Sequence, residues 1–134
     1  MHPHLTFNGQ CEAAFRFYEK CLGGKIVFMM SYGDSPMAGE TPALWREKIL
    51  HATFTWGGHT LSGGDATPEG YEEPRGFSVS LDIVDAAEAD RIFATLSENG
   101  VVQVPIQETF WAQRFGMLVD QFGTPWMINC AKPA

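Results

Sequence analysis

The stretch FSVSLDIVDAAEADRIFATLSENG, residues 77–100, decides the fold. Residues 77–83 alternate apolar and polar side chains, as a half-buried strand does. Asp85 then stands at the start of a predicted helix, residues 86–99, with Glu88 three positions later as in a capping box. Gly100 ends this helix, whose apolar residues recur at helical spacing: Ala89, Ile92, Phe93 and Leu96. The stretch therefore predicts a strand followed by an amphipathic helix that covers one face of a sheet.

The same order of elements occurs twice along the chain. After the helix, apolar runs predict strands at 101–107, 115–120 and 126–130. In the first half, strands are predicted at 4–7, 25–32, 48–56 and 59–62, with a helix at 11–22 whose apolar face is formed by Ala14, Phe15, Tyr18 and Leu22. Internal repetition of this kind is a strong indicator of architecture. We therefore expect an α+β fold of two tandem βαβββ modules that form cupped mixed sheets.

The turns and the length of the chain divide it into two modules of one domain. Gly57-Gly58 supplies the positive φ angles of a hairpin turn, and the loop at 33–45 is rich in Gly and Pro. A chain of 134 residues fits a single domain. We expect module one at about 4–66, a connection at 67–75 and module two at about 76–131. The extra hairpin strand in each half argues against a pair of ferredoxin-like units.

Composition excludes several classes of partner. The net charge of −7 argues against nucleic acid and anionic membrane surfaces, which attract basic proteins. No apolar run reaches the roughly 20 residues that span a bilayer, and residues 1–5 lack the features of a signal peptide. The three cysteines, an odd number, lack a metal-type pairing, so we expect reduced thiols in a cytoplasmic protein.

Several motifs together resemble one family. They are LTFNG at 5–9, AF at 14–15, FYEKCLGG at 17–24, YGD at 32–34, ILHA at 49–52 before Gly57-Gly58, PIQETFW at 105–111 and DQFGTPWMINC at 120–130. Their order and spacing, over nearly the whole chain, are similar to those of PhnB-like proteins in the vicinal-oxygen-chelate (glyoxalase and bleomycin-resistance) superfamily. The resemblance implies the paired βαβββ fold, a concave cavity in each cupped sheet and a homodimer.

The resemblance also implies where a metal would bind. Enzymes of the superfamily hold a divalent metal with ligands on the first and last strands of each half, and the metal stabilises an oxyanion as a Lewis acid. Carried over, these positions fall at or next to His4, at Ser62, among Ser78, Val79 and Ser80, and at Met127. Apart from His4, these side chains are poor ligands for a hard divalent ion. We therefore expect neither the usual metal site nor another cofactor. The alternative is that the protein binds a divalent metal.

A different metal site stays open from the remaining histidines. His51 and His59 flank the predicted hairpin, and His4 is expected near them. Asp65 could reach inward from its position after Gly63-Gly64 and complete the set. The alternative is that His4 and His59 are solvated residues without a ligand.

Strand alternation sorts the side chains of a cavity from those of the core. The predicted core sides are Leu50, Ala52, Phe54 and Trp56 on one strand; Phe77, Val79, Leu81 and Ile83 on another; and Trp126, Ile128 and Cys130 on the last. The opposite sides mix apolar and polar residues, as small-molecule cavities do. The candidate ligand-binding residues are His51, Thr53, Ser62, Ser78, Ser80, Met127, Trp111 and Tyr32.

His51 is the candidate catalytic residue. A neutral imidazole can give or accept a proton near pH 7, so His51 could act as a general base or orient a substrate carbonyl. The alternative is a histidine that only hydrogen-bonds within a polar sheet face. Trp111 either walls a pocket or contacts a second subunit, and Tyr32 either lines the mouth of the cavity or exposes its hydroxyl to water.

Three functions stay open. The leading hypothesis is a small-molecule-binding protein that sequesters its ligand. The second is a metal-dependent lyase, isomerase or dioxygenase of the vicinal-oxygen type, and the third is a protein with a role only in assembly. Related sequences are sometimes labelled demethylubiquinone methyltransferases, but the chain has no room for a methyl-donor nucleotide fold. We expect a homodimer, in which association protects the edge strands. A monomer in light scattering at micromolar concentration would refute this expectation.

Overall fold

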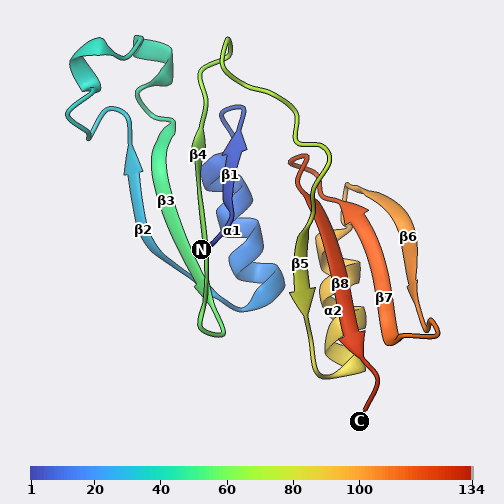
Figure 1. Ribbon diagram of the computed structural model, residues 1–134. Helices are drawn as coiled ribbons and strands as arrows, with labels where there is room; N and C mark the ends of the chain where they lie inside the picture. Colours follow the sequence, from blue (N-terminus) through green and yellow to red (C-terminus); the bar gives the residue numbers. More distant parts are fainter. Residues whose placement is uncertain (134) are drawn as a thin grey trace. The chain divides into compact units, whose positions relative to one another are not determined.

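The chain forms two compact units, each built from a strand, a helix and three further strands. The computed structural model describes residues 1–133 and divides at Glu73, with Met1–Glu72 in the first unit. Figure 1 shows the repeat, with the first unit in blue to green and the second in yellow to red. The predicted repeat of two βαβββ modules is therefore confirmed.

The first unit is a four-stranded mixed sheet with one helix against it. Its elements are β1 (His4–Phe7), α1 (Cys11–Leu22), β2 (Lys25–Ser31), β3 (Ile49–Trp56) and β4 (His59–Asp65). The strand order is β1-β4-β3-β2, in which β1 and β4 are parallel and the other neighbours are antiparallel. Two short 3-10 helices, Ala38–Glu40 and Ala43–Trp45, lie within the predicted loop.

One face of the first sheet is closed by the apolar stripe of α1. The predicted stripe is fully or almost fully buried, and Phe15 makes edge contacts with Phe7 and Phe54, at centroid distances of 6.1 and 6.2 Å. Burying such aromatic side chains contributes strongly to stability. The opposite face of this sheet carries the candidate polar residues.

Strand β4 is longer than predicted because two glycines let it pack closely. A Cβ atom at Gly63 would lie 2.9 Å from the Leu5 carbonyl oxygen, and one at Gly64 would lie 2.5 Å from that of Leu50. Glycine has no Cβ, so the strand continues through this crowded region to Asp65. The prediction that the strand ends at Ser62 was wrong, since Gly-Gly was interpreted as a break.

The second unit repeats the arrangement with different side chains. Its elements are β5 (Val79–Asp82), α2 (Ala86–Leu96), β6 (Val101–Gln107), β7 (Ala112–Val119) and β8 (Pro125–Ala131). The strand order is β5-β8-β7-β6, with β5 and β8 parallel. All four residues of the predicted α2 stripe are buried.

The structure confirms the predicted cap at the start of α2, but the helix ends earlier than predicted. The Asp85 carboxylate accepts a hydrogen bond of 3.0 Å from the Glu88 backbone N–H. The helix ends at Leu96, and Gly100 N–H bonds to Ser97 in a turn that places Asn99 at a positive φ of 59°. Among residues 1–133, neither helix is long and apolar enough to cross a membrane.

Two predicted strands begin elsewhere in the structure. Strand β5 begins at Val79 rather than at Phe77, because Gly76 turns the chain with a φ of +78°. Phe77 is therefore 49% exposed, not part of the core under α2. Strand β7 begins at Ala112, three residues before the predicted start. Trp56, also predicted to face the core, is only partly buried and contacts His59.

Candidate functional site

Strand pairing brings three predicted site residues together on the first sheet. Ser62 on β4 is paired with His4 on β1 and with Thr53 on β3. The His4 Nδ1 and Ser62 Oγ atoms lie 2.8 Å apart, within hydrogen-bond distance. The position at which the resemblance expects a ligand on the first strand therefore contacts the position expected on the fourth.

His51 joins this group from the next position on the same face of β3. Its ring is stacked on that of His4 with centroids 5.9 Å apart and planes inclined by 20°. The Oγ1 atom of Thr53 lies 3.3 Å from His51 Nε2, and Phe28 on β2 contacts the His51 ring at 6.0 Å. We call the set His4, His51, Thr53, Ser62 and Phe28 the histidine face.

The electrostatics of the histidine face favour a neutral imidazole at His4. Partial burial lowers the pKa of His4 below its ordinary value of 6.5, and positive charge on His51 and His2 lowers it further. A neutral His4 can accept a proton at one ring nitrogen and donate one at the other. The face can therefore orient a polar group or exchange a proton with it.

The histidine face does not fit the divalent metal that the resemblance implies. It offers two imidazoles and a serine hydroxyl, whereas a divalent metal usually takes three or four protein ligands. Within residues 1–133, no group of three or more His, Cys, Asp or Glu side chains is arranged to hold a metal ion.

Asp65 does not reach inward to complete a site, so that prediction was wrong. Its side chain is 3% exposed, and its two carboxylate oxygens accept hydrogen bonds of 2.9 Å from the backbone N–H groups of Cys11 and Ile49. The first of these groups lies at the start of α1, where a negative charge is stabilising. Asp65 therefore holds the helix to the sheet.

The Tyr32 hydroxyl is bonded to the backbone of the first unit. It donates a hydrogen bond of 2.6 Å to the carbonyl oxygen of Asp65. Burial and the nearby Asp65 charge raise the pKa of Tyr32 above its ordinary value of 10. The alternative of a hydroxyl exposed to water was therefore wrong, whereas a place for Tyr32 at the mouth of the cavity stays a prediction.

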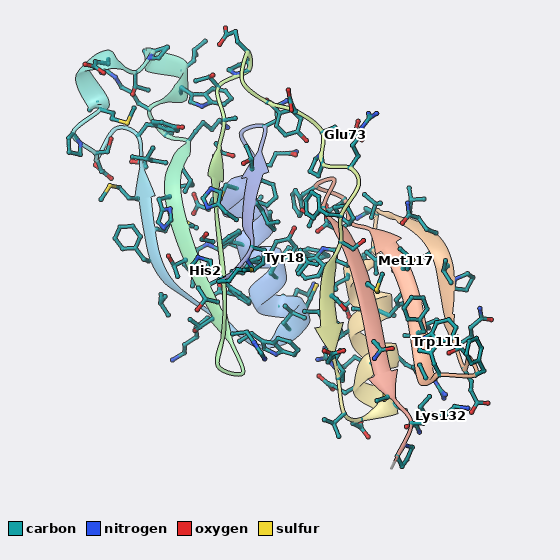
Figure 2. The ribbon with its side chains drawn as sticks, viewed as in Figure 1. His2, Tyr18, Glu73, Trp111, Met117 and Lys132 are labelled. Carbon is teal, nitrogen blue, oxygen red and sulfur yellow. The ribbon has the colours of Figure 1, made fainter. Side chains whose placement is uncertain are left out.

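The second unit contains a cavity of about 710 Å³, within the size range of small-molecule sites. Two predicted ligand-binding residues, Ser78 and Met127, line it. Residues that were not predicted also line it, and they include Arg75, Phe77, Gln103, Met117 and Val119. Figure 2 labels Glu73 and Met117, which both belong to the lining.

The floor of this cavity is formed by neighbouring residues of β7 and β8. Met117 is paired with Met127, and Val119 with Pro125, so the two pairs form consecutive apolar rows on one face of the sheet. Ser80 on β5 is paired with Met127 and continues the first row. The uncertain register among Ser78, Val79 and Ser80 is thus resolved: Ser80 is the residue opposite Met127.

Trp111 is separated from the cavity. It lies at the other end of the second sheet from Glu73 (Figure 2). Its ring contacts Phe110 at 4.8 Å and Phe115 at 5.3 Å, and the side chain is 49% exposed. Trp111 is therefore part of an exposed aromatic group, and the prediction that it walls a ligand pocket has no support from its position.

The lining residues that were not predicted differ in how clearly the sequence indicates them. Met117 alternates with the buried Gly116 and Leu118, so its face follows from strand periodicity. Gln103 lies where the register between β6 and β7 shifts, and such a bulge leaves no simple sequence signal. Arg75 and Phe77 belong to the segment before β5, whose path depends on the positive φ at Gly76.

Comparison with known proteins identifies the family. The family model described as 3-demethylubiquinone-9 3-methyltransferase matches residues 1–129. Protein YjdN of Escherichia coli strain K12 is 34% identical, over 98% of this chain and 95% of that protein.

Solved structures share the fold. Protein PA1353 from Pseudomonas aeruginosa is 44% identical, with a TM-score of 0.90 over 99% of this chain and 98% of that one. The PhnB protein from Bacillus cereus is 23% identical, with a TM-score of 0.81 over 98% of both chains, a likeness that concerns the fold. The chain therefore belongs to the family whose model is described as 3-demethylubiquinone-9 3-methyltransferase.

Proposed function

We propose that this PhnB-like protein binds a small organic molecule in the cavity of its second unit, without the usual metal of the superfamily. The observation that carries the proposal is the cavity of about 710 Å³ with an apolar floor and a few polar lining residues. Ligand sites have this composition because apolar contact supplies affinity and a few polar groups fix orientation. Ser78, Gln103 and Arg75 are the polar groups that can donate hydrogen bonds.

The histidine face is a second candidate site, which would bind polar groups of a ligand in the first unit. His4 with Ser62, and His51 with Thr53, already contact one another, and both imidazoles can bind polar groups of a ligand. The alternative function, a metal-dependent lyase, isomerase or dioxygenase, needs more ligands than the two imidazoles of this face supply. A binding protein is the function that the geometry supports best.

Methyl transfer is a less suitable function than binding for this architecture. Doubly wound folds bind nucleotides at the carboxyl ends of parallel strands, where the strand order reverses. Each sheet here has one parallel pair and two antiparallel pairs. The family description names a methyltransferase, but our proposal rests on the cavity.

A charge placed on the cavity floor tests the proposal. Small molecules that raise the melting temperature of the native protein are first selected, because a ligand that binds the folded state stabilises it. The Met117→Glu variant is expected to weaken their binding at least about tenfold, since an unpaired carboxylate would be buried against the ligand. Val84→Glu is the matched control, because Val84 is 97% exposed and lies outside the lining. Equal affinity in both variants would contradict the proposal.

A further inference from the structure

The two methionines on the cavity floor indicate the chemical class of the ligand. Met117 and Met127 are direct partners on neighbouring antiparallel strands, and both line the cavity. Neighbouring strands lie about 4.8 Å apart, so the two thioether side chains lie next to each other on one sheet face. Both are only partly buried in the second unit, which leaves side-chain surface for a ligand.

Thioethers favour aromatic partners over saturated ones. Sulfur is polarisable and makes favourable contacts with the edge and face of aromatic rings, in addition to ordinary apolar burial. The sheet beneath the methionines presents a further apolar row, Val119 with Pro125, and Phe77 adds an aromatic ring to the lining. A flat ring laid on this floor would contact both methionines at once, which a branched aliphatic molecule would do less well.

The polar lining indicates the kind of substituent on that ring. Arg75, Gln103 and Ser78 can each donate hydrogen bonds, and the arginine carries a positive charge. Arg75 is 4.0 Å from the Glu73 carboxylate, and both side chains are largely exposed, at 85% and 71%. An exposed ion pair of this length is weak, so a ligand acceptor can compete for the guanidinium.

We infer that the cavity takes a flat aromatic ring that carries a hydrogen-bond acceptor such as a carboxylate. The ring lies against Met117 and Met127, and the acceptor is oriented toward the donors of Arg75, Gln103 and Ser78. This inference rests on the proposed function, because it names the ligand class of the same cavity.

Three probes of similar size separate the elements of this inference. The first is 2-naphthoate, the second is decalin-2-carboxylate, its fully saturated counterpart, and the third is 2-naphthylmethylamine, which replaces the acceptor by a donor. Dissociation constants are measured by calorimetry on the wild-type protein. The expected order of affinity is naphthoate first, with both other probes weaker.

A leucine double variant shows whether the sulfur atoms cause the preference. Met117→Leu with Met127→Leu nearly conserves volume and apolar character, so the fold is retained. It is expected to weaken naphthoate binding by about 2- to 10-fold per sulfur contact and to leave decalin-2-carboxylate binding unchanged. Val84→Leu is the control outside the cavity.

The measurements distinguish a wrong ligand class from a wrong proposed function. Equal binding of naphthoate and decalin-2-carboxylate, unchanged by the leucine variant, would overturn the aromatic ligand class. So would an absence of naphthoate binding while other compounds bind in a way that Met117→Glu abolishes, and in that case the proposed function stands. If no compound at all binds in a way that depends on Met117, both the ligand class and the proposed function are wrong.

Discussion

The two units place different chemistry on the same backbone row. Where β1 meets β4 in the first unit, His4 is paired with Ser62; where β5 meets β8 in the second, Ser80 is paired with Met127. The first row is polar, and its side chains bond to each other at 2.8 Å. The second row continues into Met117 on the floor of a cavity.

This difference shows that the repeat determines where a site lies but not what the site does. Both rows sit at the parallel strand pair on the face opposite the helix, because each helix buries its stripe on the other face. The choice of side chains then makes one row a hydrogen-bonded group and the other an apolar surface. Function belongs to the residues placed on a fold, not to the fold.

The largest effect is expected from Asp65, whose two hydrogen bonds to backbone N–H groups make it a structural residue of the first unit. Asp65→Ala removes the acceptor of two backbone N–H groups, and leaving them buried without partners costs about 2–4 kcal/mol of unfolding free energy. Urea denaturation measures this change. Asp82→Ala is the control, because Asp82 is exposed and its change should fall within about 0.5 kcal/mol. Similar effects of the two variants would show that Asp65 is not a structural residue.

A smaller effect distinguishes the two serines of the compared rows. Ser62 is 2% exposed and bonded to His4, so Ser62→Ala should lower the unfolding free energy by about 0.5–1.5 kcal/mol. Ser80 is exposed, so Ser80→Ala should change it by less than about 0.5 kcal/mol. Equal losses measured by urea denaturation would remove the distinction between the polar row and the cavity row.

The smallest effect is the pH dependence that His4 gives to the stability of the first unit. Because burial and the neighbouring histidines lower the pKa of His4 in the folded protein, the unfolded chain binds more protons just below pH 6.5. The contribution of His4 to the unfolding free energy is therefore constant above about pH 6.5 and falls as the pH drops toward the folded pKa. His4→Gln should lose less stability than the wild type between about pH 7 and pH 5.5. The same loss in both proteins would contradict a lowered pKa at His4.

The regular elements were predictable because they depend on local periodicity. The stripes of α1 and α2, the Asp85 cap and the alternation of Trp126 and Ile128 follow from side-chain spacing alone, and the structure confirms them. Prediction failed at Gly63-Gly64, where glycine allowed close packing within a strand and did not break it.

The candidate site was predictable only where strand pairing was simple. Counting from the hairpins placed Ser62 and Met127 on the correct faces, and the pairing with His4 and Ser80 follows from the parallel strands. The path before Val79 was not predictable, since it depends on a turn at Gly76. Asp65 was misplaced because its two partners are distant in sequence, and nothing local indicates them.

A methionine methyl NMR spectrum tests the central claim most directly, because methionines report on both units. Met117 and Met127 lie on the cavity floor, whereas Met30 is paired with His51 in the first unit. The protein, labelled at the methionine methyl groups, is titrated with the stabilising small molecules. The account predicts that the signals of Met117 and Met127 shift while that of Met30 does not. Shifts at Met30 with none at Met117 and Met127 would contradict it and place the ligand on the histidine face.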